Sequence, residues 1–363
     1  MEKFNKGSIP PRILISPLDW GLGHTTRCIP LIHKWLAAGY EVSVACNEFQ
    51  QSVLKKEFPS LKYYSLPGYA IEYGKTGLST YWKLLCQIPK ILRSIKNEHQ
   101  WLQQHLLLHP ADYIISDNRY GFFTREVKSI FITHQLAPRT QLGRGMDYLL
   151  SWRICAWINR FKECWIPDLP EHPLLSGRLS VPVKPLNIPV KYIGGISRFK
   201  TCKPEKTGTP YILVILSGPE PQRSLLEMKI VQDAVNSPLP IQLVRGSSAP
   251  STIDWNLTNL KCIDIADTDS LQLLICNADL VISRAGYTSI LDYATLHPKA
   301  VLVPTPGQSE QQYLAYHLQE QKIAPFLEQH AFSIQAAIEI ARDFPYHWPS
   351  AVNARNEDLT LEG

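Results

Sequence analysis

The chain has 363 residues, of which 45% are hydrophobic and 19% charged, a composition typical of a folded protein long enough for two domains. Its net charge of +5 is mild and its basic residues are dispersed, so nucleic acid is not expected as a partner. The first residues lack a signal-peptide core, and no run of about 18 uncharged apolar residues predicts a transmembrane helix. The eight cysteines are scattered without a C-x-x-C pair, which favours a reducing cytoplasm over a disulfide framework or zinc site.

Strand and helix patterns alternate in the first half of the chain. Residues 12–16 read as a buried strand, residues 24–38 as a helix, and residues 41–45, 112–116 and 129–133 as further strands. Such alternation predicts parallel strands joined by crossover helices. A glycine loop, Asp19-Trp20-Gly21-Leu22-Gly23-His24, separates the first strand from the first helix. It lacks the third glycine of a dinucleotide site, and no ribose-binding acidic residue ends the second strand, so a nicotinamide or flavin cofactor is not expected.

A proline-rich segment, residues 167–206, reads as a linker, and the alternation then restarts at residues 211–215. The fold class expected is therefore α/β, with two Rossmann-like domains whose ligands bind at the carboxyl ends of both sheets. We assign residues 1–195 to the first domain and residues 196–345 to the second. Residues 346–363 form a C-terminal tail, of which the charged segment 353–363 is expected to fray.

The most informative segment begins after a short apolar strand, residues 278–282. A turn containing Gly286 follows and opens a helix, an arrangement that presents backbone N–H groups to a phosphate. Asp292 lies more than one turn into that helix, where its carboxylate can accept hydrogen bonds from a ribose. After the next strand, residues 300–303, Gln311 and Gln312 offer amides suited to sugar hydroxyls. Together these groups predict a nucleotide-sugar site.

These motifs resemble the donor-binding half of family 28 glycosyltransferases, whose best-known member makes lipid II for peptidoglycan. The resemblance is strongest over residues 263–323 and again near the N-terminus. It implies the GT-B architecture, two Rossmann-like domains with parallel sheets that face each other across a cleft. It also implies contacts with the donor at both glycine loops of the second domain and at an arginine that opens it. The donor-binding residues expected in addition to Gly286, Asp292, Gln311 and Gln312 are Arg198, Ser217, Gly218, Ser283, Arg284, Tyr287, Thr288 and Ser289. The alternatives are a solvated linker charge for Arg198 and a simple turn for Ser217-Gly218.

The same resemblance places the acceptor and its phosphates at the N-terminal glycine loop, shaped by Gly21 and Gly23. It makes His24 a candidate general base or phosphate ligand, although His24 could instead cap the helix. Arg27 is either a phosphate ligand or a surface arginine. His134 and Gln135 resemble an acceptor-side run of the family, but the family's glutamate is absent, so they are either acceptor ligands or an ordinary loop.

Asp117 is a second candidate base, because it follows a predicted strand and a carboxylate there could deprotonate an acceptor hydroxyl. The alternative is turn formation, since Asp117-Asn118 is a favoured turn pair. Asp267-Thr268-Asp269 superficially resembles a metal-binding D-x-D, but an N-cap before an apolar helix is the preferred interpretation. No metal ligands and no cofactor are therefore assigned, because a helix dipole can offset the charge of a leaving diphosphate.

Two aromatic and basic segments, residues 81–93 and 148–160, are either interfacial helices or core helices. The function expected is an inverting hexosyltransferase that moves N-acetylglucosamine or another hexose from a UDP-sugar to a lipid-linked or cell-envelope acceptor. The expected location is the cytoplasm, with peripheral contact to the inner face of the plasma membrane as an open alternative. Two rival functions are a UDP-sugar 2-epimerase of the same fold and a nucleotide-sugar-binding subunit without its own chemistry.

Overall fold

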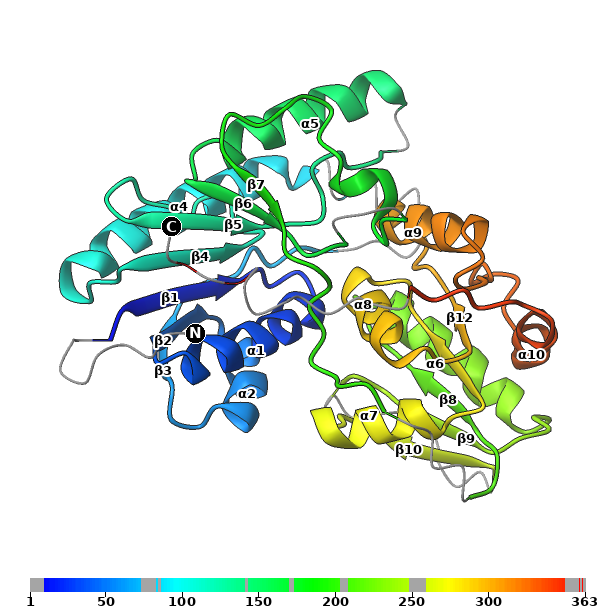
Figure 1. The fold of residues 1–363 in the computed structure, drawn as a ribbon. Coiled ribbons are helices and arrows are strands. Elements are labelled where there is room, and N and C mark those ends of the chain that lie inside the picture. Colours follow the sequence, from blue (N-terminus) through cyan, green and yellow to red (C-terminus); the bar gives the residue numbers. More distant parts are fainter. Residues whose placement is uncertain are drawn as a thin grey trace. The chain divides into compact units, whose positions relative to one another are not determined.

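The computed structural model describes residues 10–72, 83, 86–140, 143–169, 173–202, 208–247, 259–349, 359 and 361. Contacts divide the chain into two compact units. Unit 1 comprises Met1–Ile71, Leu84–Ile196 and Val352–Gly363, and unit 2 comprises Glu72–Lys83 and Ser197–Ala351. Within the described ranges, each unit contains one parallel sheet with helices on its faces (Figure 1). The fold class predicted from the sequence, two Rossmann-like α/β domains, is confirmed.

Unit 1 contains a seven-stranded parallel sheet with the strand order β3-β2-β1-β4-β5-β6-β7. Its strands are β1 (Arg12–Pro17), β2 (Glu41–Cys46), β3 (Lys62–Ser65), β4 (Tyr113–Asp117), β5 (Lys128–Ile132), β6 (Glu163–Ile166) and β7 (Val190–Tyr192). The central strands are runs of buried aliphatic residues, as expected for a parallel sheet that is covered on both faces.

Among the residues that the structure describes, four helices cover the two faces of this sheet (Figure 1). Helices α1 (Leu22–Ala37) and α2 (Glu48–Glu57) lie on one face, and helices α4 (Ile88–Leu108) and α5 (Arg144–Ile158) lie on the other. A short 3-10 helix, η1 (Gly177–Ser180), precedes β7. The largest core cluster of unit 1 joins apolar residues of α1, such as Ile32 and Trp35, to strand residues such as Ile13 and Val44.

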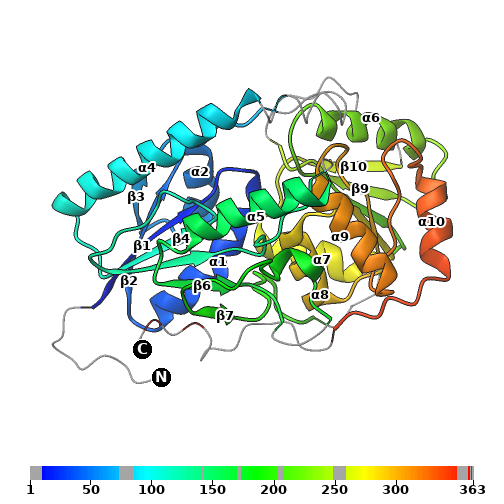
Figure 2. The same ribbon diagram turned by 90° about the horizontal axis from the view of Figure 1, so that it is seen from above.

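Unit 2 contains a five-stranded parallel sheet with the order β10-β9-β8-β11-β12. Figure 2 shows this sheet between helix α6 on one side and helices α7 and α8 on the other. Side chains of α6 and α10 pack in one core cluster with the strands. The elements are β8 (Ile212–Ile215), α6 (Gln222–Ala234), β9 (Ile241–Val244), β10 (Leu260–Ile263), α7 (Thr268–Asn277), β11 (Leu280–Ser283), α8 (Tyr287–Leu296), β12 (Ala300–Leu302), α9 (Ser309–Glu320) and α10 (Ile334–Arg342).

Two expectations need correction. The cysteines were expected to be unpaired, but Cys202 and Cys276 form a disulfide that joins the start of unit 2 to the end of α7. Residues 353–363 were expected to fray; of these only Leu359 and Leu361 lie within the described residues, and both are buried in unit 1. There the Trp35 indole donates a hydrogen bond to the carbonyl of Leu359 at 3.3 Å. Sequence patterns missed both features because each depends on residues far apart in the chain.

Among the residues that the structure describes, no helix has the length and apolar character needed to cross a membrane.

Candidate active site

The first candidate site lies in unit 1, where β1, β4 and β5 end. Parallel strands present their carboxyl ends at one edge, and the register places Pro17 beside Asp117 and Asp117 beside Ile132. Helix α1 starts at this edge after Gly21, whose φ of +89° is a left-handed conformation that favours glycine. His24 and Arg27 lie one turn apart at the beginning of α1, so both side chains reach the end of β4.

His24, Arg27, Asp117 and His134 form one hydrogen-bonded cluster. His24 Nδ1 lies 3.2 Å from Asp117 Oδ1. Arg27 Nε donates to Asp117 Oδ2 at 3.3 Å, and Arg27 Nη2 makes a close contact with Asp117 Oδ1. Arg27 Nη1 lies 3.2 Å from His134 Nδ1, and Arg27 Nη2 lies 3.0 Å from His24 Nδ1. The four residues come from three separate elements and are brought together only by the fold.

The electrostatics of this cluster separate the two candidate bases. Burial raises the pKa of Asp117, but the Arg27 guanidinium and then His24 outweigh burial and hold this pKa at about 2. The Asp117 side chain is 1% exposed, whereas the His24 side chain is 15% exposed. Asp117 is therefore an ionised carboxylate inside the protein, and His24 is the member of the pair that solvent reaches.

The remaining acceptor-side residues differ in burial. Arg27 is buried within the cluster, which contradicts the alternative of a surface arginine. His134 is also buried, and Gln135 is partly exposed. Gly23 is partly exposed in the first turn of α1.

The sequence analysis assigned no role to a buried ion pair beside this site. Arg119 Nε donates to Glu98 Oε2 at 2.9 Å, and the other guanidinium nitrogens donate to the carbonyls of Pro17 and Pro67. Glu98 Oε1 accepts the backbone N–H of Gly121 at 2.5 Å, and a side chain at Gly121 would collide with the backbone of α4. This ion pair thus fixes the loops after β1, β3 and β4. In the sequence, only the run Ser116–Gly121 could have indicated this ion pair.

The second candidate site lies in unit 2, where β8, β11 and β12 end side by side. Ser217 and Gly218 follow β8, and Gly218 has a φ of +97°. Helix α8 begins after its N-cap Gly286, and no side chain caps it; the positive end of its dipole favours an anion at this position. Gly286, Thr288 and Ser289 are partly exposed, which suits contact with a diphosphate.

Asp292 is buried, and its carboxylate already has partners within unit 2. The Ser197 hydroxyl donates to Asp292 Oδ1 at 2.7 Å, and Arg198 Nε lies 3.7 Å from Asp292 Oδ2. Burial raises the pKa of Asp292 to about 6, although Arg198 and Ser197 act in the opposite direction. The structure thus brings together Arg198 and Asp292, two predicted donor ligands 94 positions apart in the sequence.

Other predicted donor ligands are engaged inside unit 2. The Arg284 guanidinium donates to the carbonyls of Val303 at 3.2 Å and Gln222 at 2.7 Å, and burial lowers its pKa to about 10. Gln311 Oε1 accepts the backbone N–H of Thr305 at 2.9 Å. Ser283 and Tyr287 are buried, whereas Gln312 is partly exposed. Arg284 and Gln311 therefore hold the loops after β11 and β12 in place.

The structure also tests the Asp267–Asp269 pair. Asp267 caps α7, with its Oδ1 accepting the backbone N–H of Ser270 at 2.8 Å, so the capping interpretation is confirmed. Within the described parts of the chain, no group of three or more His, Cys, Asp or Glu residues is placed to hold a metal ion.

Comparisons with known proteins agree with this architecture. Residues 226–343 match the profile of the glycosyltransferase family 28 C-terminal domain. No curated protein sequence matches the chain. Three similar solved structures cover nearly the whole chain at low identity and show the GT-B fold. They are the glycotransferase of kitacinnamycin (15% identity, TM-score 0.64, covering 96% of this chain and 93% of that chain), the calicheamicin glycosyltransferase CalG4 (12%, 0.62, 97% and 93%) and the spinosyn rhamnosyltransferase SpnG complexed with thymidine diphosphate (14%, 0.58, 91% and 91%).

The fold and the family 28 domain confirm the predicted enzyme class, a glycosyltransferase. The match to the family profile lies in unit 2 and contains β11, α8, β12 and α9, the elements that carry most of the predicted donor residues.

Proposed function

We propose that this glycosyltransferase is an inverting enzyme that moves a hexose, such as N-acetylglucosamine, from a UDP-sugar to a lipid-linked or cell-envelope acceptor. The observation that carries the proposal is the His24–Asp117 pair at the carboxyl edge of the unit 1 sheet. A histidine held by a buried carboxylate is suited to take a proton from a hydroxyl group.

In the proposed reaction, His24 Nε2 removes the proton of the acceptor hydroxyl. The acceptor oxygen attacks C1 of the sugar as the bond from C1 to the diphosphate oxygen breaks, which inverts the configuration at C1. Asp117 accepts the Nδ1–H of His24 and stabilises the imidazolium that forms, while Arg27 keeps Asp117 ionised. This division of roles makes His24 the base and Asp117 the residue that orients it.

On the donor side, we propose that the first turn of α8 binds the diphosphate and that Asp292 accepts hydrogen bonds from the ribose. The helix N-terminus offsets negative charge on the leaving diphosphate, so the proposal includes no divalent metal ion. Unchanged transfer after chelation with EDTA is the expected result, and loss of transfer that magnesium restores would contradict this part. Gln312 is the amide best placed by exposure to contact the sugar.

The residues proposed for the donor bind its diphosphate and ribose, and none of them selects the nucleobase. The SpnG structure contains thymidine diphosphate, so the donor experiment compares UDP-sugars with TDP-sugars. Both nucleotides share the diphosphate and the 3′-hydroxyl, but thymidine lacks the 2′-hydroxyl of uridine, so the comparison reports on the base and the 2′-hydroxyl together.

The test is transfer from radiolabelled UDP-N-acetylglucosamine into a lipid extract, with released UDP measured in parallel. His24→Ala is expected to lower the rate by about 10²–10⁴-fold, typical of a lost general base, without changing the dissociation constant for the donor. His33→Ala is the matched control, because His33 is an exposed histidine on the same helix. Full activity in a folded His24→Ala protein would contradict the assignment of the base.

The same experiment distinguishes the two rival functions. A 2-epimerase would convert the free UDP-sugar without an acceptor, and its product would remain attached to UDP. A binding subunit would bind UDP-sugars without releasing UDP in the presence of the extract. Release of UDP together with label in the lipid fraction is expected only of a glycosyltransferase and of neither rival function.

For the acceptor, we propose contact between unit 1 and a membrane surface through α5. Tyr148, Leu149 and Trp152 are exposed on this helix, and Arg144 and Arg153 lie beside them in the sequence. Exposed apolar rings with neighbouring cations are typical of helices that lie in the interface of an anionic membrane. The other predicted segment, residues 81–93, lies only partly within the described residues.

A further inference from the structure

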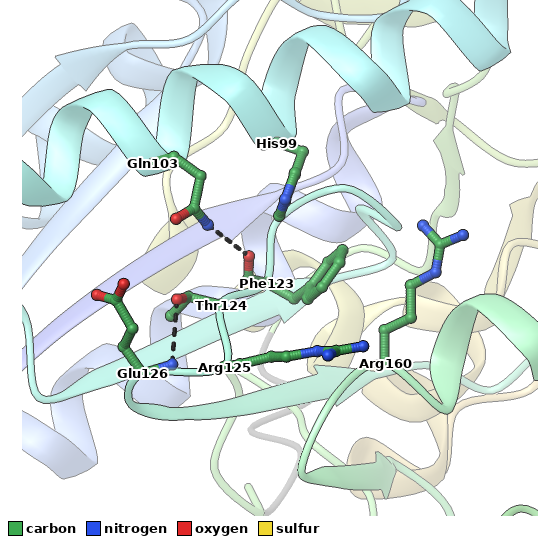
Figure 3. A pocket seen from close by; sticks show the side chains of 7 residues that line it. All are labelled: His99, Gln103, Phe123, Thr124, Arg125, Glu126 and Arg160. Atoms are coloured by element: carbon green, nitrogen blue, oxygen red, sulfur yellow. Dashed lines mark hydrogen bonds between the residues drawn. The ribbon is translucent and has the colours of Figure 1, made fainter.

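A pocket of about 490 Å³ lies in unit 1 between α4, the loop before β5 and Arg160, two residues beyond the end of α5 (Figure 3). Its lining residues are His99, Gln103, Phe123, Thr124, Arg125, Glu126 and Arg160. The loop and Arg160 precede β5 and β6, so the pocket lies at the amino ends of these strands. The His24–Asp117 cluster lies at the carboxyl ends, and the length of β5, roughly 15 Å at the usual rise per residue, separates the two edges.

Two arginines give the pocket its positive charge. Arg125 and Arg160 are both exposed, and within the described parts of the chain neither guanidinium forms an ion pair with a carboxylate. Figure 3 shows the Arg125 side chain extending toward Arg160 along one side of the pocket. Guanidinium groups bind phosphate through paired N–H donors, so two of them at one pocket favour a phosphate ligand.

Uncharged polar groups complete this end of the pocket. His99 Nδ1 lies 3.1 Å from the carbonyl of Gly121, and because a carbonyl only accepts, Nδ1 carries the hydrogen. His99 Nε2 is then able to accept a phosphate O–H, or to donate to a phosphate oxygen when protonated. Thr124 is 2% exposed, and its Oγ1 accepts the backbone N–H of Glu126 at 3.3 Å. A buried hydroxyl group therefore forms part of the lining.

The aromatic wall of the pocket argues against a nucleotide. The Phe123 ring stacks on His99 with centroids 4.5 Å apart, and the Arg160 guanidinium carbon lies 5.8 Å from the Phe123 centroid. These contacts use the ring surface on which a base would stack. The pocket thus offers phosphate ligands without a platform for a base.

Glu126 defines the chemistry of the opposite end. Figure 3 shows its carboxylate on the far side of the pocket from Arg160. A carboxylate there repels a second phosphate but accepts hydrogen bonds from a hydroxyl group or an ammonium group. We propose that this pocket binds a small phosphate monoester whose other end carries an amine or a hydroxyl group.

The experiment measures phosphoethanolamine and inorganic phosphate binding to the full chain by calorimetry at constant ionic strength. Arg125→Gln with Arg160→Gln is expected to weaken binding of both probes by about tenfold or more, because the charge-assisted hydrogen bonds are lost. Glu126→Gln is expected to weaken phosphoethanolamine binding and to leave inorganic phosphate binding unchanged or stronger. Arg342→Gln is the matched control, since Arg342 is an exposed arginine of α10 that does not line the pocket.

The outcomes separate this pocket from the donor site and from a lipid ligand. UDP-N-acetylglucosamine binding is expected to be the same in all four proteins, and phosphoethanolamine is expected to remain bound when UDP is added. Equal affinity of the double variant and the wild type for both probes would overturn the proposal. If only vesicles of phosphatidic acid bind, in a manner that needs both arginines, the same phosphate chemistry belongs to a lipid and not to a soluble ester.

Discussion

Asp117 combines deep burial with the closest charged contacts of the unit 1 site. A carboxylate taken out of water is costly unless a cation and hydrogen bonds compensate, and Arg27 supplies both here. The guanidinium also keeps Asp117 ionised across the neutral range, since its pKa is held at about 2. An ionised Asp117 next to His24 Nδ1 favours one orientation of the imidazole, which the proposed role of His24 as the base requires.

Asp292 leads to a prediction about pH. Its pKa of about 6 means that the neutral acid persists in the free protein to mildly acidic pH. Ribose hydroxyls donate more strongly to the carboxylate than to the neutral acid, so affinity for UDP-N-acetylglucosamine is expected to rise as pH increases through about 6. Asp292→Asn is expected to weaken binding by about 1.5–3 kcal/mol and to flatten this profile. Calorimetric titration between pH 5 and pH 8 measures both effects.

The stability of the free protein is expected to fall as pH rises, whereas the affinity for the donor is expected to increase. A carboxyl whose folded pKa is raised favours the folded state below its unfolded pKa, and this contribution is lost as pH rises through about 6. For the titrations of donor affinity, Asp343→Asn is the control for Asp292→Asn, because Asp343 is exposed beyond the end of α10. An unchanged pH profile of donor affinity in Asp292→Asn would remove Asp292 from the ribose site.

At the residue scale, the sequence predicted the ends of the strands better than the contacts made there. His24 and Asp117 were recognisable because each follows an apolar run, and β1 and β4 are neighbours in the sheet. The pairing of Arg27 with Asp117 depends on the direction in which α1 leaves the glycine loop. The engagement of Arg284 by the Val303 and Gln222 carbonyls depends on packing between elements. Neither follows from spacing along the chain.

At the scale of elements, helix α5 combines the two interpretations that its sequence allowed. Ser151, Ile154, Cys155 and Ile158 are buried and hold the helix on the sheet. Leu149 and Trp152 are 56% and 50% exposed on the other side. The helix is therefore both a core element and a carrier of exposed apolar side chains, because its apolar residues surround most of its circumference.

The exposed side of α5 gives a prediction about membranes. Leu149→Ser with Trp152→Ser is expected to lower binding to phosphatidylglycerol vesicles by about tenfold or more, since each apolar side chain that leaves the lipid forfeits transfer free energy. Sedimentation with vesicles measures the bound fraction. Leu107→Ser with Leu108→Ser is the matched control at the end of α4, where both leucines are highly exposed. Equal losses in the two double variants would show that the effect is not specific to α5.

Most long central elements agree with their predicted bounds, whereas short edge strands were missed. The predicted strands 12–16 and 41–45 correspond to β1 and β2, each one residue longer in the structure. Strands β3 and β7 contain only four and three residues and lie at the two edges of the sheet. β7 also lies within the proline-rich segment that reads as a linker. Tertiary pairing, not local propensity, stabilises such strands.

At the scale of the whole molecule, the boundary between the units is not a single point in the sequence. Unit 1 includes residues 352–363 as well as the N-terminal half, so the chain returns to unit 1 after completing unit 2. Leu359 and Leu361 belong to the same core cluster as Trp35 and Val44. This return could not be predicted, because two leucines in a charged tail show no periodic pattern.

The return of the chain makes the stability of unit 1 depend on residues that follow unit 2. Leu361 is 1% exposed, and its carbonyl accepts a hydrogen bond from Lys128 Nζ at 3.2 Å. Leu359→Ala with Leu361→Ala is expected to destabilise unit 1 by about 2–5 kcal/mol or more, because buried leucine side chains are replaced by cavities. Hydrogen exchange should therefore accelerate in β1 and β2, while β8 and β11 of unit 2 serve as an internal reference. Leu107→Ala is the matched control, since Leu107 is 83% exposed and its removal leaves no cavity. Equal acceleration in both units would mean that they unfold together, and unchanged exchange in β1 would show that the C-terminal leucines contribute nothing to the core of unit 1.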